Sequence, residues 1–217
     1  MKVSIGSHLI RQVKQFKYLG VTLEENLSWS SSKKLMEKQA RSALARVASM
    51  GVSSGNLSVR GSVMVWKCLV RSHLEYCAEV HGDSSWKEAE RIQYDMGRRI
   101  LRCSRSTPEV AIRGELGWWS MKGRRDLARL CFWFKLIGPH RGRLVHQVYK
   151  ASRERYLIHG KNNWCKYTHR LLKELGLATY WTEDTIALTV RLVRGLIFRR
   201  EEGLWQSDLN RTPKLKT

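Results

Sequence analysis

Hydrophobic residues recur at two different periods along this chain. Near its start the pattern is typical of strands, because Phe16, Tyr18 and Val21 are residues that favour extended backbone. Residues 24–26, with the sequence EEN, are typical of a turn. The segment therefore predicts a β-hairpin or a small three-stranded element over residues 2–23.

From residue 29 onward the apolar residues recur at helical spacing, and glycine- or serine-rich breaks separate the segments. The first predicted helix ends at the break over residues 50–56, the second lies within residues 57–80, and a third begins at a cap on Ser84 or Ser85. The residues predicted to face the core are Met36, Ala40, Ala43, Leu44 and Val47, then Val63, Trp66, Val70, Leu74 and Cys77, then Trp86, Ala89, Ile92, Met96, Ile100 and Cys103.

Further helical segments are predicted in the second half of the chain. A short helix begins near Pro108, and a longer helix stops at Gly138 and Pro139. Its inward residues are Leu127, Leu130, Cys131, Phe134 and Ile137. Weaker stripes predict helices over residues 141–156 and 162–175, and a last helix capped by Thr182 runs through Ile186, Val190, Val193 and Ile197. The predicted fold class is mainly α, a helical bundle preceded by a small N-terminal β-hairpin element.

The charge balance narrows the class of partner. The 217 residues include 40 Lys and Arg against 19 Asp and Glu, a net charge of +21, and 42% are hydrophobic. A folded domain with this charge is expected to bind a polyanion, with nucleic acid as the first candidate and a membrane surface as the second. The sequence has no apolar run of transmembrane length and no signal-peptide pattern, so we expect an intracellular protein, nuclear or cytoplasmic. The five cysteines are odd in number and widely spaced, which predicts reduced thiols.

Basic residues gather on the predicted helices opposite their apolar stripes. Three rows are present: Lys34, Lys38 and Arg41; Arg91, Arg98, Arg102 and Arg105; and Lys122, Arg124, Arg125 and Arg129. One such row is usually a solvated face, but three rows on a chain of this charge favour phosphate binding. Contacts of this kind read the backbone of a nucleic acid and carry little sequence information. Most of the nine tryptophans, Trp66 and Trp86 among them, are predicted to lie in the core.

The sequence offers little for catalysis. Two-metal phosphoryl transfer needs clustered carboxylates, whereas the aspartates are scattered, and Glu201 and Glu202 have the pattern of a solvated helix face. His73 and Cys77 have permitted zinc spacing on one predicted helix, but no further pair completes four ligands. Nucleotide-binding glycine loops and a nucleophile elbow are also missing. We therefore predict no catalytic residue, metal site, cofactor or small-molecule substrate.

Three blocks of the sequence resemble a known family when they are taken together. "FKYLGVTLEENLSW", "VWKCLVRSHLEYCAEVHG" and "AERIQYDMGRRILRCSRSTPEVAIRGELGWWSMKGRRDLARLCFWFKLI" resemble, in this order and spacing, the C-terminal part of reverse transcriptases from non-LTR (LINE-type) retrotransposons. The resemblance covers about residues 2–137. It implies that residues 16–20 match the primer-grip hairpin that closes the polymerase palm, with Lys17 and Tyr18 as nucleic-acid contacts, and that the following helices form the thumb.

The resemblance also implies a division of the chain. Residues 1–28 would be the end of a palm, residues 29–137 a helical thumb-like domain, and residues 138–217 a helical C-terminal extension. The catalytic aspartates of the family lie upstream of the hairpin in a motif of the type Y/F-x-D-D, which no residue here matches. We therefore expect a fragment of an RNA-directed DNA polymerase that binds RNA or an RNA/DNA duplex and has no catalysis on its own.

Departures from the family pattern leave a second hypothesis. The segment after Trp29 lacks an expected histidine, and His81 stands where these proteins commonly have tryptophan. Both changes are typical of a decayed element copy. The alternative is a domesticated or stand-alone, non-enzymatic, basic helical protein that binds nucleic acid or serves in an assembly. A basic peripheral membrane protein is the weaker third hypothesis, because no isolated amphipathic helix stands out.

Overall fold

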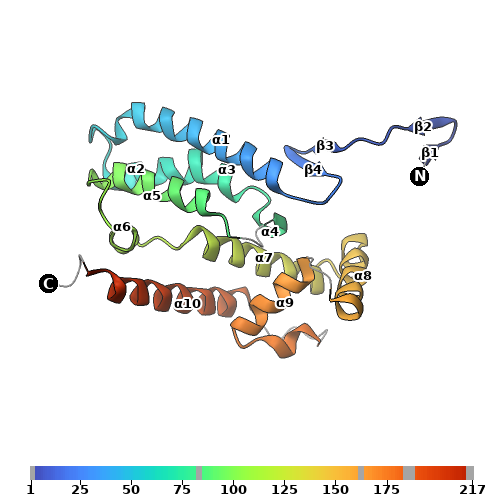
Figure 1. Ribbon diagram of the computed structural model, residues 1–217. Helices are drawn as coiled ribbons and strands as arrows, with labels where there is room; N and C mark the ends of the chain where they lie inside the picture. The colour runs from blue at the N-terminus through green and yellow to red at the C-terminus, as the bar shows by residue number, and fades with distance from the viewer. Residues whose placement is uncertain (1–2, 82–84, 161–163, 183–188, 214–217) are drawn as a thin grey trace.

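The computed structural model describes residues 3–81, 85–160, 164–182 and 189–213 and is mainly helical, with its described strands at the N-terminus (Figure 1). This confirms the predicted fold class. The helices are α1 (Ser30–Val47), α2 (Val59–Val65), α3 (Arg71–Glu75), α4 (Ala78–His81), α5 (Lys87–Leu101), α6 (Glu109–Leu116), α7 (Met121–Ile137), α8 (Leu144–His159), α9 (Trp164–Glu174) and α10 (Val190–Arg211). No described helix is long and apolar enough to cross a bilayer.

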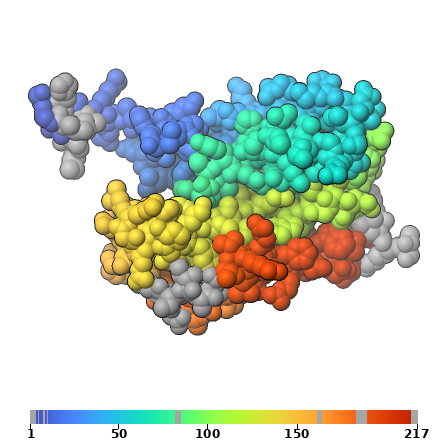
Figure 2. Space-filling model, turned by 180° about the vertical axis from the view of Figure 1, so that it is seen from behind, coloured from blue at the N-terminus to red at the C-terminus, as the bar shows by residue number. Residues whose placement is uncertain are grey.

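The predicted β element consists of two separate antiparallel hairpins. Strand β1 (Val3–Ile5) pairs with β2 (His8–Ile10), and β3 (Gln15–Tyr18) pairs with β4 (Val21–Glu24). The turn of the second hairpin places Leu19 at φ 45° and Gly20 at φ 81°, and a positive φ at both central positions is what a type I′ hairpin turn requires. The N-terminal strands project from the helical body, as the view from behind also shows (Figure 2).

The predicted second helix is broken more than once. A π-helical turn (Trp66–Val70) joins α2 to α3, and α3 ends where Tyr76 adopts an extended conformation. Cys77 then has a left-handed backbone with φ 53°, so the prediction that His73 and Cys77 lie on one helix is wrong. The physical reason is the Tyr76 side chain, whose hydroxyl donates to the Leu19 carbonyl oxygen at 2.6 Å and ties this break to the β3–β4 hairpin.

Two predicted helix caps are also wrong. The N-cap of α5 is Trp86 rather than Ser85, and its indole donates to the Glu37 carboxylate of α1; Ser84 lies outside the described residues. The described α10 begins at Val190, where the Thr189 hydroxyl accepts the Leu192 amide at 3.2 Å. Thr182 instead ends a 3-10 turn (Ala178–Trp181), and Ile186 lies outside the described residues.

The buried hydrophobic side chains of the described residues form two clusters. The first joins α1, the π-helical turn, α3 and α5, and it extends to Met121 at the start of α7. The second begins at Leu130 within α7 and joins α8, α9 and α10. Helix α7 therefore contributes one end to each cluster, and its position decides where its charged residues lie.

Candidate nucleic-acid interface

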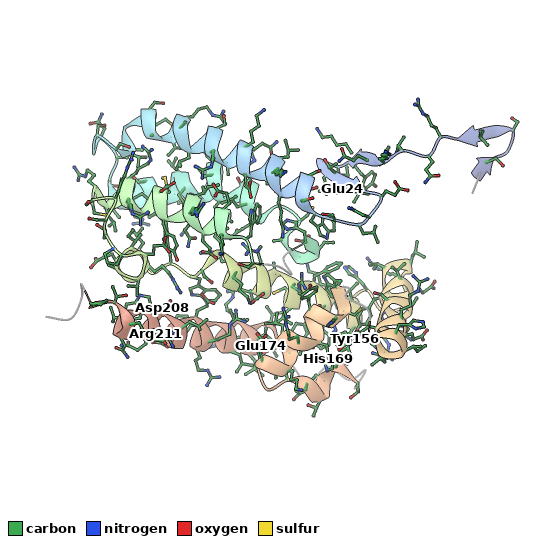
Figure 3. The ribbon with its side chains drawn as sticks, in the orientation of Figure 1. Glu24, Tyr156, His169, Glu174, Asp208 and Arg211 are labelled. Carbon is green, nitrogen blue, oxygen red and sulfur yellow. The ribbon has the colours of Figure 1, made fainter. Side chains whose placement is uncertain are left out.

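The β3–β4 hairpin is held against the start of α1 by short polar contacts. The Ser32 hydroxyl accepts the Thr22 amide at 2.9 Å and donates to the Thr22 carbonyl at 2.8 Å. The Glu24 carboxylate accepts the Ser31 amide at 2.9 Å, and hydrogen bonds from Ser31 lower the pKa of this carboxyl group. Figure 3 labels Glu24 at this junction. The carboxylate thus complements the N-terminal end of the α1 dipole.

The hairpin presents the two predicted contact residues to solvent. Lys17 and Tyr18 are both exposed on β3, and the exposed fraction of Tyr18 is 58%. Phe16 is exposed to the same extent on this strand. The hairpin therefore offers aromatic and basic side chains beside the start of α1, and the role of Lys17 and Tyr18 in binding stays a prediction.

Helix α1 places its basic row on the surface, as predicted. Lys34, Lys38 and Arg41 are exposed, whereas Met36 and Ala40 on the opposite side are buried. Arg41 forms an ion pair with Glu88 in the first turn of α5. The ion pairs among the described residues do not include Lys34 or Lys38, so their positive charges are compensated less than that of Arg41.

Helix α5 runs beside α1 in the same direction. Trp86 at its start contacts Glu37 of α1, and Arg99 near its end contacts Ser53, which follows α1. Of the predicted second row, Arg91 is exposed and Arg98 is half-buried on α5, whereas Arg102 and Arg105 are exposed beyond its last residue, Leu101, so the row does not follow one helix throughout. The two rows therefore form one basic face, which we call the α1–α5 face. It consists of Lys34, Lys38 and Arg41 from α1 and of Arg91, Arg98, Arg102 and Arg105 from α5 and the segment that follows it.

A hollow of about 710 Å³ lies at the end of this face. It is lined by Ser53, Asp95, Arg98, Arg99, Arg102, Cys103 and Arg105. The structure thus brings three predicted residues of the α5 row together and adds Arg99 and Ser53, which the sequence analysis missed. Arg99 could have been found, because it lies three residues before Arg102 and so on the same side of a helix.

The third predicted row is largely not a surface row. Lys122 is exposed and Arg124 half-buried, but Arg125 and Arg129 are each only 1% exposed, so the prediction that these two face outward is wrong. The Arg125 guanidinium lies 5.6 Å from the Trp86 ring centre, and that of Arg129 lies 5.9 Å from the ring centre of Trp164. Packing of α4, α9 and α10 around α7 covers the side that the helical period assigned to water.

Two carboxylates from other helices hold the start of α7. Glu90 of α5 accepts the amides of Met121 at 3.0 Å and Lys122 at 2.9 Å. Glu201 of α10 accepts the Ser120 amide at 2.9 Å and pairs with Arg113 at 3.3 Å. The prediction that Glu201 lies on a solvated face is therefore wrong, because its exposed fraction is 3%.

A second hollow, of about 450 Å³, lies between α5 and α7. Four basic residues, Lys87, Arg91, Lys122 and Arg125, line it together with the acidic residues Glu90 and Glu109. Burial raises the pKa of the Glu109 carboxyl. Predicted residues from two rows thus meet here, but the acidic groups offset much of their charge, so the first hollow is the more strongly basic of the two.

Other candidate chemistry is sparse among the described residues. No three His, Cys, Asp or Glu side chains within that part of the chain gather to hold a metal ion. The tryptophans predicted to be internal are internal: Trp66 is 1% exposed and stacks on Trp118 at 5.5 Å between ring centres, and Trp86 is 5% exposed. Beside the second cluster the Tyr156 hydroxyl lies 3.0 Å from His169 Nδ1. Figure 3 labels both residues.

Comparison with known proteins identifies relatives among curated sequences. The chain is 26% identical, over 182 residues, to the RNA-directed DNA polymerase from mobile element jockey of Drosophila melanogaster. The matched residues make up 84% of this chain and 17% of that protein. It is also 22% identical over 102 residues to the protein of the same description from Drosophila funebris. That match covers 47% of this chain and 11% of the relative. The chain is similar to RNA-directed DNA polymerases of mobile elements.

This similarity supports the predicted polymerase family, and the chain spans less than a fifth of the length of these relatives. No protein-family model matches the sequence, and no solved structure matches it. The assignment of residues 1–28, 29–137 and 138–217 to palm end, thumb and extension therefore stays a prediction.

Proposed function

We propose that this chain is a fragment of a non-LTR retrotransposon RNA-directed DNA polymerase that holds a template–primer duplex through its phosphates. The observation that carries the proposal is the similarity to a mobile-element polymerase over 182 residues of the chain. In this proposal the β3–β4 hairpin acts as the primer grip, and the helices from α1 to α7 act as the thumb. Residues from α8 onward form a helical extension.

The distribution of charge supports binding through the backbone of the duplex. Lys34, Lys38, Arg91 and Arg102 are exposed on the α1–α5 face, where they can neutralise phosphates without reading bases. A polymerase must hold duplexes of any sequence, which suits contacts of this kind. An RNA/DNA hybrid has A-like geometry and is recognised through its shape and backbone.

Fluorescence anisotropy with a labelled RNA/DNA hybrid tests the binding over a series of salt concentrations. Each phosphate neutralised contributes about 0.9 to the slope of log K against log salt, so Lys34→Ala with Lys38→Ala should reduce the slope by about 2. The matched control is Lys150→Ala with Lys173→Ala, which removes the same charge from exposed positions on α8 and α9. No binding by the unaltered chain at low salt, or binding that ignores salt, would refute the proposal.

We further propose that the chain alone does not catalyse polymerisation. No two aspartates are adjacent anywhere in the sequence, whereas the family motif needs such a pair to hold catalytic metal ions. A primer-extension assay on a primed RNA template with Mg²⁺ or Mn²⁺ tests this directly. Incorporation of nucleotides by the purified chain, at a rate that follows chain concentration, would overturn it.

A further inference from the structure

The hollow at the end of α5 has an unusual concentration of positive charge. Within the described part of the chain four arginines line it, at positions 98, 99, 102 and 105, and Asp95 is the one acidic residue among these lining side chains. Asp95 is already engaged, since its carboxylate lies 3.7 Å from Arg98 Nη1. Ligand pockets of this size are mostly apolar, so this lining indicates an anionic occupant.

The surrounding chain is fitted to these arginines. Arg98 Nη2 donates to the Thr107 carbonyl at 3.2 Å, and Arg99 Nη1 donates to the Ser53 hydroxyl at 3.4 Å. Gly55 has φ +84°, and a Cβ at this position would lie 2.4 Å from Arg102 Nη1. The loop after α1 therefore makes room for the Arg102 guanidinium, while Arg98 Nε is buried without a hydrogen-bond partner among the described residues.

The backbone of Arg102 gives a second, independent indication. It has left-handed dihedrals, φ 52° and ψ 38°, at the end of α5, a position where glycine is favoured. A residue with a Cβ is disfavoured in this conformation, because the Cβ comes too close to the following carbonyl oxygen. The helix end is closed by the Cys103 amide, which donates to the Arg98 carbonyl at 3.1 Å, and this bond does not require a side chain at position 102. Arg102 thus occupies a backbone conformation that arginine does not favour, and residues in such conformations cluster at functional sites.

We propose that this hollow is a phosphate site that receives two neighbouring phosphates of one nucleic-acid strand. Guanidinium groups bind phosphate oxygens through paired hydrogen bonds, which a convex row of lysines does not provide. The four arginines exceed the single aspartate by three charges, enough to neutralise two phosphodiesters. The inference rests on the proposed function and adds that the strand is anchored at the end of the α1–α5 face away from the hairpin.

The first experiment measures anion binding without nucleic acid. Inorganic pyrophosphate, at constant ionic strength, should raise the Tm of the unaltered chain, because a ligand that binds the folded state stabilises it. The variant Arg99→Gln with Arg102→Gly keeps the left-handed backbone easy to form and should lose this rise. The control Lys150→Gln with Lys173→Gln should keep it. An equal rise in both variants, or none in the unaltered chain, would overturn the proposal.

The second experiment separates this proposal from the proposed function. The Arg99→Gln, Arg102→Gly variant should bind the RNA/DNA hybrid with a salt slope lower by about 2, which corresponds to two lost phosphate contacts. Failure of the unaltered chain to bind the hybrid would refute the proposed function itself. Hybrid binding by this variant with unchanged affinity and slope would refute the phosphate site alone. If the double variant does not fold, Arg102→Gly and Arg105→Gln are measured singly; each should lower the salt slope by about 1, and unchanged affinity and slope in both would refute the phosphate site.

Discussion

The buried carboxylate of Glu201 contacts residues from three parts of the chain. Its carboxylate accepts the Ser120 amide at the start of α7, pairs with Arg113 of α6, and lies 3.5 Å from Arg200 Nη2. Gly123 of α7 packs so closely that a Cβ there would lie 2.5 Å from the carboxyl carbon. A buried charge with this many partners stabilises the fold mainly because its removal leaves the partners buried and unpaired.

We expect Glu201→Gln to lower the free energy of unfolding by about 3 kcal/mol, since Arg113 would remain buried without its counter-charge. Urea denaturation followed by circular dichroism measures the change. Glu202→Gln is the matched control, because Glu202 is the exposed neighbour on the same helix and should change stability by less than about 0.5 kcal/mol. Equal effects of the two substitutions would contradict the buried role of Glu201.

His81 is a second residue whose burial has a measurable consequence. It is fully buried with its ring near Trp29 and Trp86, and its Nε2 donates to the Tyr76 carbonyl at 2.7 Å. Burial lowers the pKa of His81 below its usual 6.5, and the positive charges of Lys33 and Arg125 act in the same direction. The unfolded chain therefore takes up a proton first as the pH falls below about 6.5.

Stability should accordingly fall as the pH is lowered through this range, until the folded-state pKa of His81 is reached. His81→Phe should show a weaker dependence of unfolding free energy on pH than the unaltered chain, because one protonation difference has been removed. The part that remains includes His169, whose pKa is also lowered by burial. His159→Gln, at an exposed position, is the comparison variant for the loss of a different histidine. An unaltered slope in His81→Phe would show that His81 is not the group responsible.

At the scale of elements, α5 and α6 approach each other through a glycine. Gly97 is buried on α5, and a Cβ there would lie 2.4 Å from Ile112 Cγ2 of α6 and 3.4 Å from Trp118. Ile112 is itself fully buried, so neither side can move away into solvent. The position of α6 against α5 thus depends on the absence of one side chain, and α6 in turn carries Arg113 to Glu201.

Gly97→Ala should destabilise the protein by roughly 1–3 kcal/mol through overpacking, even though alanine favours helices more than glycine does. Gly203→Ala on α10 is the control, since a Cβ there meets no atom within 4 Å. It should stabilise the helix by up to about 1 kcal/mol. Thermal unfolding of the two variants distinguishes the effects by sign, and stabilisation in both would contradict the close approach.

The helical period predicted which side of each helix meets the first layer of packing. Met36, Ala40 and Val47 of α1 are buried as predicted. It failed for Arg125, Arg129 and Glu201 because their sides of α7 and α10 are covered by a second layer, which a single periodic pattern does not encode.

The helical period also predicted one part of the basic site and missed another. Lys34, Lys38 and Arg91 lie on the first packed layer, α1 and α5, whose outer side remains exposed. The hollow depends on Ser53 and Gly55 from a loop that precedes α5 by more than thirty residues, so its shape follows from tertiary contacts. Local spacing can find Arg98 and Arg102 but cannot show that a loop closes around them.

At the scale of the whole molecule, α7 connects the two hydrophobic clusters as one continuous helix. Met121 belongs to the first cluster and Leu130 to the second, with no break between them. Helix α10 adds a second connection, because the Trp205 indole donates to the Val110 carbonyl of α6 at 2.8 Å. Loss of either cluster would therefore remove packing from a helix that the other cluster needs.

We expect the two clusters to unfold in a single cooperative transition. Leu74→Ala in the first and Leu172→Ala in the second each remove a fully buried side chain and should cost about 2–5 kcal/mol. Hydrogen exchange in moderate urea should then speed up in both α3 and α9 for either variant, because partial unfolding would break α7. Leu204→Ala, at a position that is 52% exposed on α10, is the control and should leave exchange in both helices nearly unchanged. Faster exchange confined to the substituted cluster would instead show that α7 can remain folded on one side alone, and the two clusters would then be independent units.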